Sequence, residues 1–380
     1  MSWKIALAEV SFGTEEYDAI KRVLDSGWVS MGPETEAFES EFADYLGIGH
    51  AVAVSSGTTA LHLGLLAAGV GSGDEVIVPS LTFVATANAV LYAGAIPVFA
   101  DITGVDDLNI SIDQIERKIT PRTKAVICVH YAGFSCAMDR LRSLAQSRGL
   151  AVVEDAAHAP GASFRGKKLG TWGDVGCFSF FSNKNMTTAE GGMVVTDSLP
   201  IARTIRMLRS HGMTTLTWDR HRGHSFSYDV VEPGFNYRMD EIRAALGRAQ
   251  LAKLEDNNAM RRIATEGLRD RLAGVDQISI PFQDQALEES SCHIFPILID
   301  KAGRRPGLME HLKNQGIQTS IHYPPVHRFS TYQSNGPARA DGLAFTEDVA
   351  SREITLPLFP RILPEQLDAI SSEVRSFLEK

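Results

Sequence analysis

From about residue 50 onward, the chain alternates short apolar runs with longer segments of mixed character. The apolar runs are rich in Val and Ile and are bounded by turn residues, which is typical of β-strands. The mixed segments repeat apolar residues at helical spacing. Strands are therefore expected at 51–56, 75–80, 96–102, 124–133 and 150–159, and helices at 58–70, 82–94, 111–119 and 138–149.

The expected strands are apolar on both faces, which indicates a sheet covered by helices on each side. This alternation predicts an α/β fold with a large, mostly parallel sheet and functional loops at the carboxyl ends of its strands. Two further strands are expected at 177–181 and 191–197, followed by a helix near 199–210.

The last third of the chain has a different pattern. A long helical stretch runs from about Asp240 to Leu272, and a strand is expected at 291–300, with helices at 305–316 and 364–380. We expect residues 1–249 to form a large α/β domain that includes the N-terminal segment. Residues 250–380 are expected to form a smaller α+β domain.

The composition excludes some classes of function. The 380-residue chain is 44% hydrophobic and 22% charged, which is ordinary for a soluble globular protein. Its net charge of -9 argues against a general nucleic-acid binder or membrane-surface binder, because both need basic faces. The longest apolar run, 89–100, is too short to span a bilayer and contains Pro97.

The opening MSWKIALAEVSFGTEE has no basic stretch followed by a long apolar one, so no signal peptide is visible. The four cysteines are scattered without a CxxC pair. This spacing favours buried free thiols over disulfides or metal ligands. We therefore expect a cytoplasmic protein without a metal site.

Two motifs lie where expected strands end. In SSGTTA, Gly57 lets the backbone approach a ligand, and the N–H groups at Thr58 and Thr59 suit a phosphate. A plain helix N-cap at either threonine is the structural alternative. In VVEDAAHA, Asp155 ends an otherwise apolar strand. Its carboxylate either caps the next segment or faces a cation such as a protonated pyridine nitrogen.

A third motif is CFSFFSNKNMTTAEGG, in which Lys184 is the only charged residue between Asp174 and Glu190. Burying an unpaired ammonium is costly. Either the amine reaches solvent along a packed stem, or it is consumed chemically as a Schiff base. Ser179, five residues earlier, is expected on the same strand. A phosphate site, a carboxylate and a lysine in this order match what pyridoxal phosphate (PLP) requires.

Longer motifs carry a resemblance to a known family. GTTALHL, PSLTFVATANAV, VHYAGFSCAMD, EDAAHAPGASFRGKKLG, FSFFSNKNMTTAEGGMVVTD and GFNYRMDEIRAAL, together with LDSGWVSMGPETEAFESEFADYLG, IHYPPVH and LPLFP, occur in the family's order over essentially the whole chain. The chain closely resembles the sugar aminotransferases of the DegT/DnrJ/EryC1/StrS family. The resemblance implies the aspartate-aminotransferase-like fold of fold type I PLP enzymes.

The resemblance also implies roles around the cofactor. Lys184 matches the lysine that binds PLP covalently and shuttles a proton. Asp155 matches the carboxylate on the pyridinium nitrogen, and Phe83 the aromatic ring stacked on the cofactor, although a core phenylalanine is the alternative for Phe83. His158 occupies the position near the phenolic oxygen. Relatives that carry histidine in place of the lysine perform deoxygenation, so Lys184 argues against that chemistry.

For the phosphate, the resemblance implies contacts from Gly57, Thr58, Thr59 and Ser179. Asn236, in GFNYR, matches the residue that reaches the phosphate from the neighbouring subunit. The resemblance therefore predicts a homodimer with shared active sites.

On the substrate side, the segment 217–230 is rich in Arg, His, Trp and Tyr. Arg220 and His224 offer cations for a diphosphate, and a solvated polar loop is the alternative. His322, Tyr323 and His327, in IHYPPVH, resemble positions that approach the sugar and nucleotide.

The expected function is amination of a nucleotide-diphosphate (dTDP or UDP) 4-keto-6-deoxyhexose in amino sugar biosynthesis, with glutamate as donor in a ping-pong reaction. A cyclitol ketone without a nucleotide is an alternative substrate. A protein that binds PLP or a sugar for regulation, without turnover, is the alternative from another class.

Overall fold

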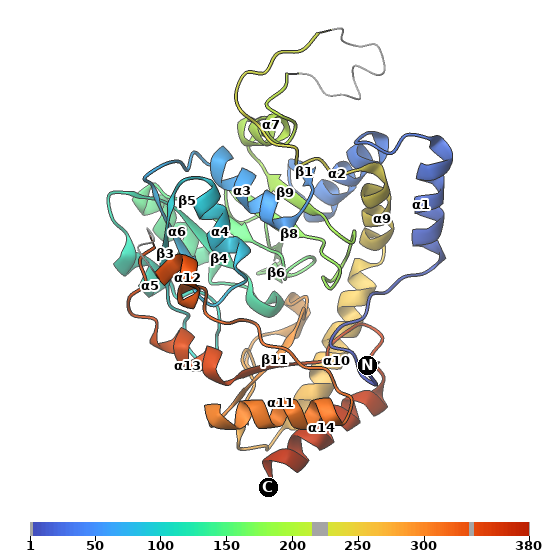
Figure 1. The fold of residues 1–380 in the computed structure, drawn as a ribbon, viewed down its shortest axis with the longest axis vertical. Helices are drawn as coiled ribbons and strands as arrows, with labels where there is room; N and C mark the ends of the chain where they lie inside the picture. The colour runs from blue at the N-terminus through green and yellow to red at the C-terminus, as the bar shows by residue number, and fades with distance from the viewer. Residues whose placement is uncertain (1–2, 215–226, 334–337, 380) are drawn as a thin grey trace.

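The computed structural model describes residues 3–214, 227–333 and 338–379, and its centre is a seven-stranded sheet with the order β1-β9-β8-β5-β4-β2-β3 (Figure 1). Within this sheet only β9 runs antiparallel to its neighbours. The predicted large, mostly parallel sheet is therefore confirmed. Its strands are β1 His50–Val54, β2 Glu75–Pro79, β3 Ile96–Ala100, β4 Thr123–Val129, β5 Ala151–Asp155, β8 Val175–Ser179 and β9 Gly192–Thr196.

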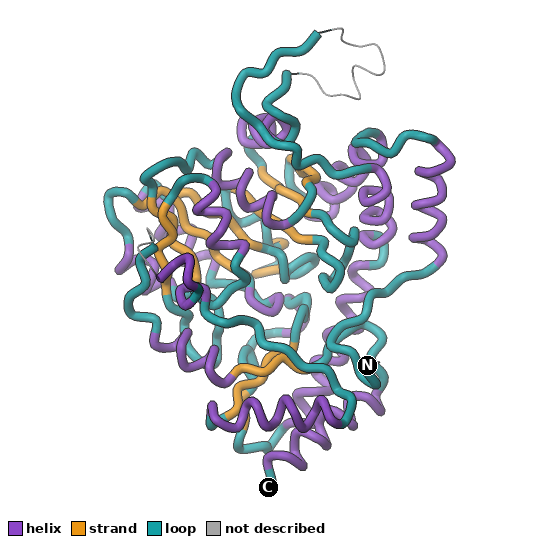
Figure 2. The backbone as a smooth tube through the Cα atoms, in the orientation of Figure 1, coloured by secondary structure: helices purple, strands orange, loops and turns teal. Residues whose placement is uncertain are grey.

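Helices cover both faces of this sheet (Figure 2), which explains why its strands are apolar on both sides. One face packs against α2 (Pro33–Leu46), α5 (Ile112–Lys118) and α6 (Met138–Arg148). The other packs against α3 (Gly57–Ala67), α4 (Ala85–Tyr92) and α7 (Leu199–Leu208). Each helix thereby contributes one apolar face to a core, whereas each strand contributes both of its faces.

The C-terminal part is built around a separate three-stranded antiparallel sheet, β10-β11-β12. Its own apolar core includes Ile5, near the start of the chain. Conversely, Leu254 packs with the large sheet. The division at residue 250 stays a prediction, and these two contacts cross it. The elements are α10 Leu254–Leu272, β10 Ile278–Ser279, β11 Phe295–Ile299, α11 Arg305–Asn314, β12 Glu353–Leu356 and α14 Pro364–Leu378.

The remaining elements are short or peripheral. Helix α1 packs against α9, and a two-stranded hairpin, β6-β7, follows β5. Their bounds, with those of the other helices, are α1 Thr14–Ser26, β6 Ser163–Phe164, β7 Lys167–Lys168, α9 Glu241–Leu251, α12 Ser330–Gln333, α13 Ala344–Arg352 and the 3₁₀ turns η1 Tyr131–Gly133, η2 Leu287–Glu289, η3 Ala302–Arg304 and η4 Val326–Arg328.

Three expected boundaries were wrong. The single helix expected over 240–272 is two helices, α9 and α10, separated by Ala252 and Lys253. The strand expected at 124–133 ends at Val129, because Ala132 and Gly133 turn the chain at φ 56° and 91°. The strand expected at 150–159 ends at Asp155.

A fourth apolar cluster joins the two parts of the molecule. It contains Leu81 and Tyr131, which follow β2 and β4, together with Leu298 from β11. The C-terminal part therefore packs against the carboxyl ends of the large sheet. All four cysteines are free and buried, as expected. In the described ranges, no helix combines the length and the apolar character that a membrane crossing needs.

Candidate active site

A cavity of about 420 Å³ lies at the carboxyl ends of the large sheet's strands. Its walls come from the loops after β1, β2, β5 and β8 and from the segment between α11 and α12. Among the lining residues are Gly57, Thr58, Phe83, Asp155, His158, Ser179, Lys184, His322 and Tyr323. The structure therefore brings together residues that the sequence marked in five separate motifs.

One end of the cavity is the start of α3. Ser56 caps this helix, because its hydroxyl accepts the Thr59 N–H at 3.2 Å. The Thr59 hydroxyl in turn donates to the Ser56 carbonyl at 2.8 Å. Both polar groups of Thr59 are therefore committed to the helix start, and Thr59 does not line the cavity, unlike Gly57 and Thr58. The predicted phosphate contact through Thr59 is thus not supported.

Gly57 is required by close packing against Ser179. A Cβ added at Gly57 would lie 2.7 Å from the Ser179 Cβ, which is closer than side chains tolerate. The start of α3 and the end of β8 therefore meet, with the Ser179 side chain beside the first N–H groups of the helix. This arrangement suits an anion, because helix N-termini present unpaired N–H groups and a positive dipole end.

Asp155 holds a buried carboxylate at the end of β5. Its Oδ2 accepts the Thr86 hydroxyl at 2.8 Å, and its Oδ1 accepts the Ala157 N–H at 3.2 Å. Burial raises the pKa of Asp155, against the opposing effect of these hydrogen bonds and of Lys184. The carboxylate both caps the following turn and lines the cavity, so the two expected roles of Asp155 are compatible.

Lys184 lies in the loop after β8, although the sequence had suggested that it shares a strand with Ser179. The strand ends at Ser179, and the Lys184 N–H donates to the Phe181 carbonyl at 3.0 Å in the turn that follows. Burial lowers the pKa of the Lys184 amine to about 8, and the Asp155 carboxylate opposes this effect. A large fraction of the amine is therefore uncharged at mildly alkaline pH.

His158 and Tyr323 form the aromatic wall of the cavity. The Tyr323 hydroxyl lies 2.9 Å from His158 Nε2, and the ring of Phe83 lies 5.9 Å from that of Tyr323. His158 Nδ1 is buried and has no partner among the described residues. Burial, with a smaller contribution from Lys184, lowers the pKa of His158 well below its usual value. Phe83 is 56% exposed, so it is not a core phenylalanine.

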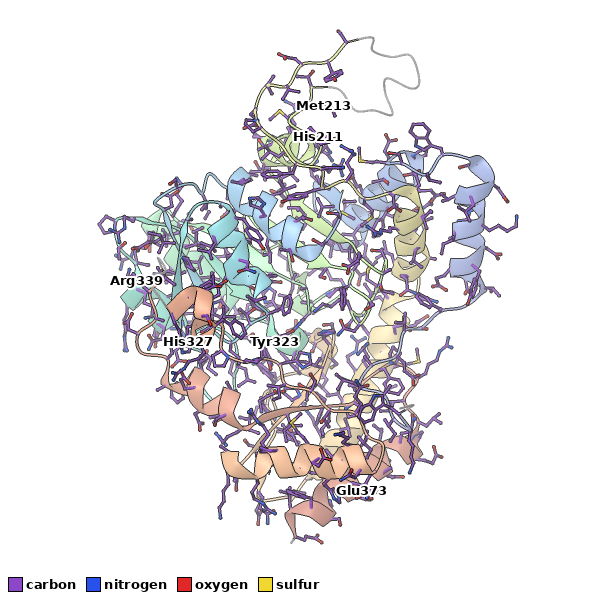
Figure 3. All side chains as sticks on the ribbon, viewed as in Figure 1. His211, Met213, Tyr323, His327, Arg339 and Glu373 are labelled. Carbon is purple, nitrogen blue, oxygen red and sulfur yellow. The ribbon has the colours of Figure 1, made fainter. Side chains whose placement is uncertain are left out.

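Figure 3 labels Tyr323 and His327, which come from the segment between α11 and α12. His322 and Tyr323 line the cavity, but His327 does not. Its Nδ1 lies 2.7 Å from the Ser80 hydroxyl and its Nε2 lies 2.6 Å from Glu347. Because both ring nitrogens are engaged, the substrate contact predicted for His327 is not supported.

Among the other predicted residues, Asn236 does not line the cavity of its own chain. Asn236 is exposed, and its backbone bridges to Ser210 beside the end of α7. Arg220 and His224 lie outside the described residues.

The structure also places residues at the site that sequence reasoning did not select. Thr86 holds Asp155, and its hydroxyl is 2.8 Å from that of Thr82, which lines the cavity. Asn183 and Glu190 line the cavity on either side of Lys184 along the chain. The one signal for the threonines is their spacing of four residues just after an expected strand.

The described residues fit PLP in three respects. The anion-binding helix start, the buried carboxylate of Asp155 and the amine of Lys184 border one cavity. His158 Nδ1 is an orphaned buried atom, which suits a hydrogen bond to the cofactor's phenolic oxygen. A protonated ring nitrogen beside Asp155 would also lower the pKa of its carboxyl, which burial raises.

Comparisons with known proteins agree with this geometry. Residues 11–375 match the model of the DegT/DnrJ/EryC1/StrS aminotransferase family. DesV from S. venezuelae, solved in complex with a ketimine intermediate, is 38% identical, with coverage of 97% of this chain and 95% of DesV and a TM-score of 0.88. DesI, solved in the presence of its TDP-sugar product, is 32% identical, with coverage of 100% and 93% and a TM-score of 0.88.

Spr1654 from Streptococcus pneumoniae, solved in its PLP form, is 28% identical, with coverage of 100% of this chain and 99% of Spr1654 and a TM-score of 0.90. The match spans nearly the whole chain, and the cavity carries the lysine and the carboxylate that the cofactor needs. This chain therefore belongs to the DegT/DnrJ/EryC1/StrS aminotransferase family of PLP-dependent sugar aminotransferases of fold type I.

Proposed function

We propose that this enzyme transfers the amino group of glutamate to the ketone of a nucleotide-diphosphate (dTDP or UDP) 4-keto-6-deoxyhexose, in the cytoplasm, as a step in amino sugar biosynthesis. The observation that carries the chemistry is the cavity shared by Lys184, Asp155 and the start of α3. The TDP-sugar product of DesI supports a nucleotide-linked substrate. The segments SGWVSMGP and HYAG, which resemble those of C4 enzymes, support the position of the ketone.

Bound PLP supplies an aldehyde that exchanges amino groups and a ring that withdraws electrons. The first N–H groups of α3 and the Ser179 hydroxyl hold the phosphate, and Lys184 provides the covalent attachment. Asp155 keeps the ring nitrogen protonated, and Phe83 covers the ring. With its pKa lowered to about 8, the Lys184 amine accepts and returns a proton near the operating pH.

The proposal includes a homodimer in which Asn236 of one protomer contacts the phosphate bound by its partner. The exposure of Asn236 and its absence from the lining of its own cavity are compatible with this role.

The first test identifies the attachment residue. Borohydride treatment of the yellow enzyme should fix the cofactor on a peptide that contains Lys184. Lys184→Ala should lower turnover by several orders of magnitude, because the removed amine is both the attachment point and the proton carrier. The matched control is Lys124→Ala, since Lys124 is exposed on β4. A labelled peptide from elsewhere would refute the assignment.

The second test identifies the substrate. The enzyme is first converted with glutamate, and the aminated form is then mixed with nucleotide-linked 3-keto or 4-keto sugars or with free cyclitol ketones. We expect turnover of a nucleotide-linked sugar, with NMR placing the new amine on C4. If only a cyclitol ketone is aminated, the proposed nucleotide-sugar substrate is wrong. If no amino donor reacts at all, a regulatory role is favoured over an enzymatic one.

A further inference from the structure

Three side chains form a hydrogen-bonded series that leads from the cavity into the C-terminal part. His322 lines the cavity, and its Nδ1 lies 2.8 Å from the Thr355 hydroxyl. That hydroxyl lies 2.5 Å from Glu353 Oε1, and the His322 backbone N–H donates to Glu353 Oε2 at 2.8 Å. Glu353 and Thr355 are two residues apart on β12, so their side chains share one face of the strand. Glu353 is 0% exposed and Thr355 is 1% exposed.

The protons in this series are interdependent. Glu353 Oε2 always accepts, because a backbone N–H only donates. When Glu353 is ionised, the Thr355 hydroxyl donates to Oε1, so it must accept Nδ1–H from His322. A neutral His322 then carries its lone pair on Nε2, which makes no hydrogen bond within the described residues. When Glu353 is protonated on Oε1, it donates to the Thr355 hydroxyl, that hydroxyl donates to His322 Nδ1, and Nε2–H becomes a donor toward the cavity.

Burial favours the neutral form of His322 and of Glu353, the two ends of the series. It lowers the pKa of His322 to about 4, with Lys184 as a smaller cause, so the imidazole stays neutral. It raises the pKa of Glu353 to about 8, against its hydrogen bonds and Arg305. Both protonation states of Glu353 are therefore accessible near the operating pH, which is the condition for efficient proton exchange.

We propose that Glu353, acting through Thr355, is a positioning residue that sets the tautomer of His322 and stores a proton which His322 takes from the ammonium group of the amino donor. In this step, an N–H bond of the ammonium breaks, its electron pair stays on the donor nitrogen, and Nε2 gains the proton. The Nδ1 proton moves to Thr355, whose own proton moves to Glu353 Oε1. His322 remains neutral throughout, so no cation forms beside Lys184. The proposal rests on the proposed function for the identity of the amino donor.

Other ionisable groups surround this series and belong in any account of its pH dependence. Arg305 from α11 and the phenols of Tyr131 and Tyr323 act on Glu353 or are influenced by it. Burial, with a smaller contribution from Lys184, lowers the pKa of His322, and burial is also the largest cause of the lowered pKa values of His158 and His293. The Tyr131 hydroxyl also donates to the His322 carbonyl.

Glu353→Gln is the informative variant. It preserves the shape of the side chain, but it allows each hydrogen bond of the series only one donor. The amide oxygen must accept the His322 backbone N–H, so the amide NH₂ faces Thr355. Thr355 then donates to Nδ1, and His322 is locked with Nε2–H toward the cavity. Thr355→Val interrupts the series at a different point, and Thr355→Ser keeps the hydroxyl as its matched control.

The first readout needs no turnover. In the PLP-bound enzyme labelled with ¹⁵N only at histidine, the His322 signal is assigned by its loss in His322→Gln. In the wild type it should change between the two neutral tautomers as the pH rises through about 8. In Glu353→Gln the neutral imidazole should show Nε2–H on both sides of pH 8. A pH-independent wild-type tautomer, or a wild-type response in Glu353→Gln, would overturn the proposal even if glutamate proved to be the wrong donor.

The second readout is the single-turnover rate with glutamate as a function of pH. Glu353→Gln and Thr355→Val should each lose at least about tenfold in rate and lose the part of the pH dependence near 8 that Glu353 contributes, while the part that Lys184 contributes remains. Thr355→Ser should recover most of the rate that Thr355→Val loses. If both Glu353→Gln and Thr355→Val kept the wild-type profile, the relay would be refuted. Near-ultraviolet circular dichroism checks that each variant is folded, and the two variants disturb different hydrogen bonds.

Discussion

At the scale of single residues, the cavity buries a carboxyl, Asp155, and an amine, Lys184, and burial disfavours the charged form of both. Burial raises the pKa of the Asp155 carboxyl and lowers that of the Lys184 amine to about 8, and each group only partly offsets the effect on the other. A carboxylate in this position gains stability from a nearby cation. The carboxylate of Asp155 therefore favours a ligand with a positively charged ring nitrogen. The lowered pKa leaves part of the Lys184 amine uncharged, which is the form that reacts with an aldehyde.

The prediction at this scale concerns Asp155→Asn. The amide oxygen can still accept the Ala157 N–H, and the amide NH₂ then faces Thr86, whose hydroxyl can rotate toward Thr82. The fold should therefore survive. The single-turnover rate with glutamate should fall roughly 100-fold, because an amide cannot hold the ring nitrogen protonated. Asp197→Asn, at an exposed position, is the control. An unchanged rate would make Asp155 a structural cap only.

Residue roles were predictable from sequence where a local motif carried the chemistry. Asp155 after an apolar strand and an isolated Lys184 are both visible in the sequence, and both line the cavity. Thr86 and Glu353 were missed because their partners lie 69 and 31 residues away along the chain. The partners of His327, Ser80 and Glu347, could not be predicted from local sequence either, and they hold its ring outside the lining of the cavity.

At the scale of elements, α2 supports the segment that carries Lys184. Phe38 and Phe42 on α2 pack against Phe178 and Phe180, with ring centroids 5.1–5.5 Å apart. The start of α2 is capped from another helix. Glu241 on α9 accepts hydrogen bonds from the N–H groups of Gly32, Glu34 and Thr35 and from the Thr35 hydroxyl, at 2.7–2.9 Å. An acidic side chain at a helix N-terminus also complements the helix dipole.

We predict that Glu241→Gln loosens α2 locally. The amide nitrogen cannot accept, so at least one of the N–H donors loses its partner, at about 1–3 kcal/mol of local opening free energy. Hydrogen exchange of the peptide that begins α2 should accelerate accordingly, while distant strands keep their protection. Glu288→Gln is the matched control because Glu288 is exposed in η2. Unchanged exchange in α2 would show that the cap contributes little.

Element types followed from periodicity, but some ends did not. The alternation after residue 50 predicted β1 to β5 and the helices between them, because burial on both faces leaves a clear pattern in the sequence. The break between α9 and α10 leaves no such pattern. Both helices reach the core of the large sheet, through Ala244 and Leu254, but α9 also packs against α1 through Ala245 and α10 packs with β11 through Leu268. These additional partners lie far away along the chain, so local periodicity does not reveal where one helix ends and the next begins.

At the scale of the whole molecule, the cavity lies where the C-terminal part packs on the carboxyl ends of the large sheet. Helices α11 and α14 lie at the opposite end from α7 (Figure 1). Asn236 lies on the backbone stretch after α7. Its neighbour Tyr237 accepts the Ser55 N–H at 2.9 Å, so this stretch is fixed beside the start of α3 in its own chain. Asn236 nevertheless does not line that cavity. The phosphate contact proposed for Asn236 therefore has two candidates, the phosphate of its own chain and that of a partner.

Mixed dimers decide this question. If Asn236 acts across the interface, each working site needs Lys184 from one chain and Asn236 from its partner, and a two-fold dimer supplies both sites by the same contact. Lys184→Ala and Asn236→Asp homodimers should each be nearly inactive, the second because the added negative charge repels the phosphate. A heterodimer of the two would hold one doubly damaged site and one intact site.

Random mixing places roughly half of the dimers in the mixed state, so activity should recover to about a quarter of the wild-type value. Co-expression with two different tags and purification of the heterodimer ensures that subunits have exchanged, and the purified heterodimer should then show about half of the wild-type activity. If Asn236 instead acts at the site of its own chain, every site in the heterodimer would lack either the Lys184 amine or the Asn236 amide. An inactive heterodimer of verified composition would therefore place Asn236 at the phosphate of its own chain.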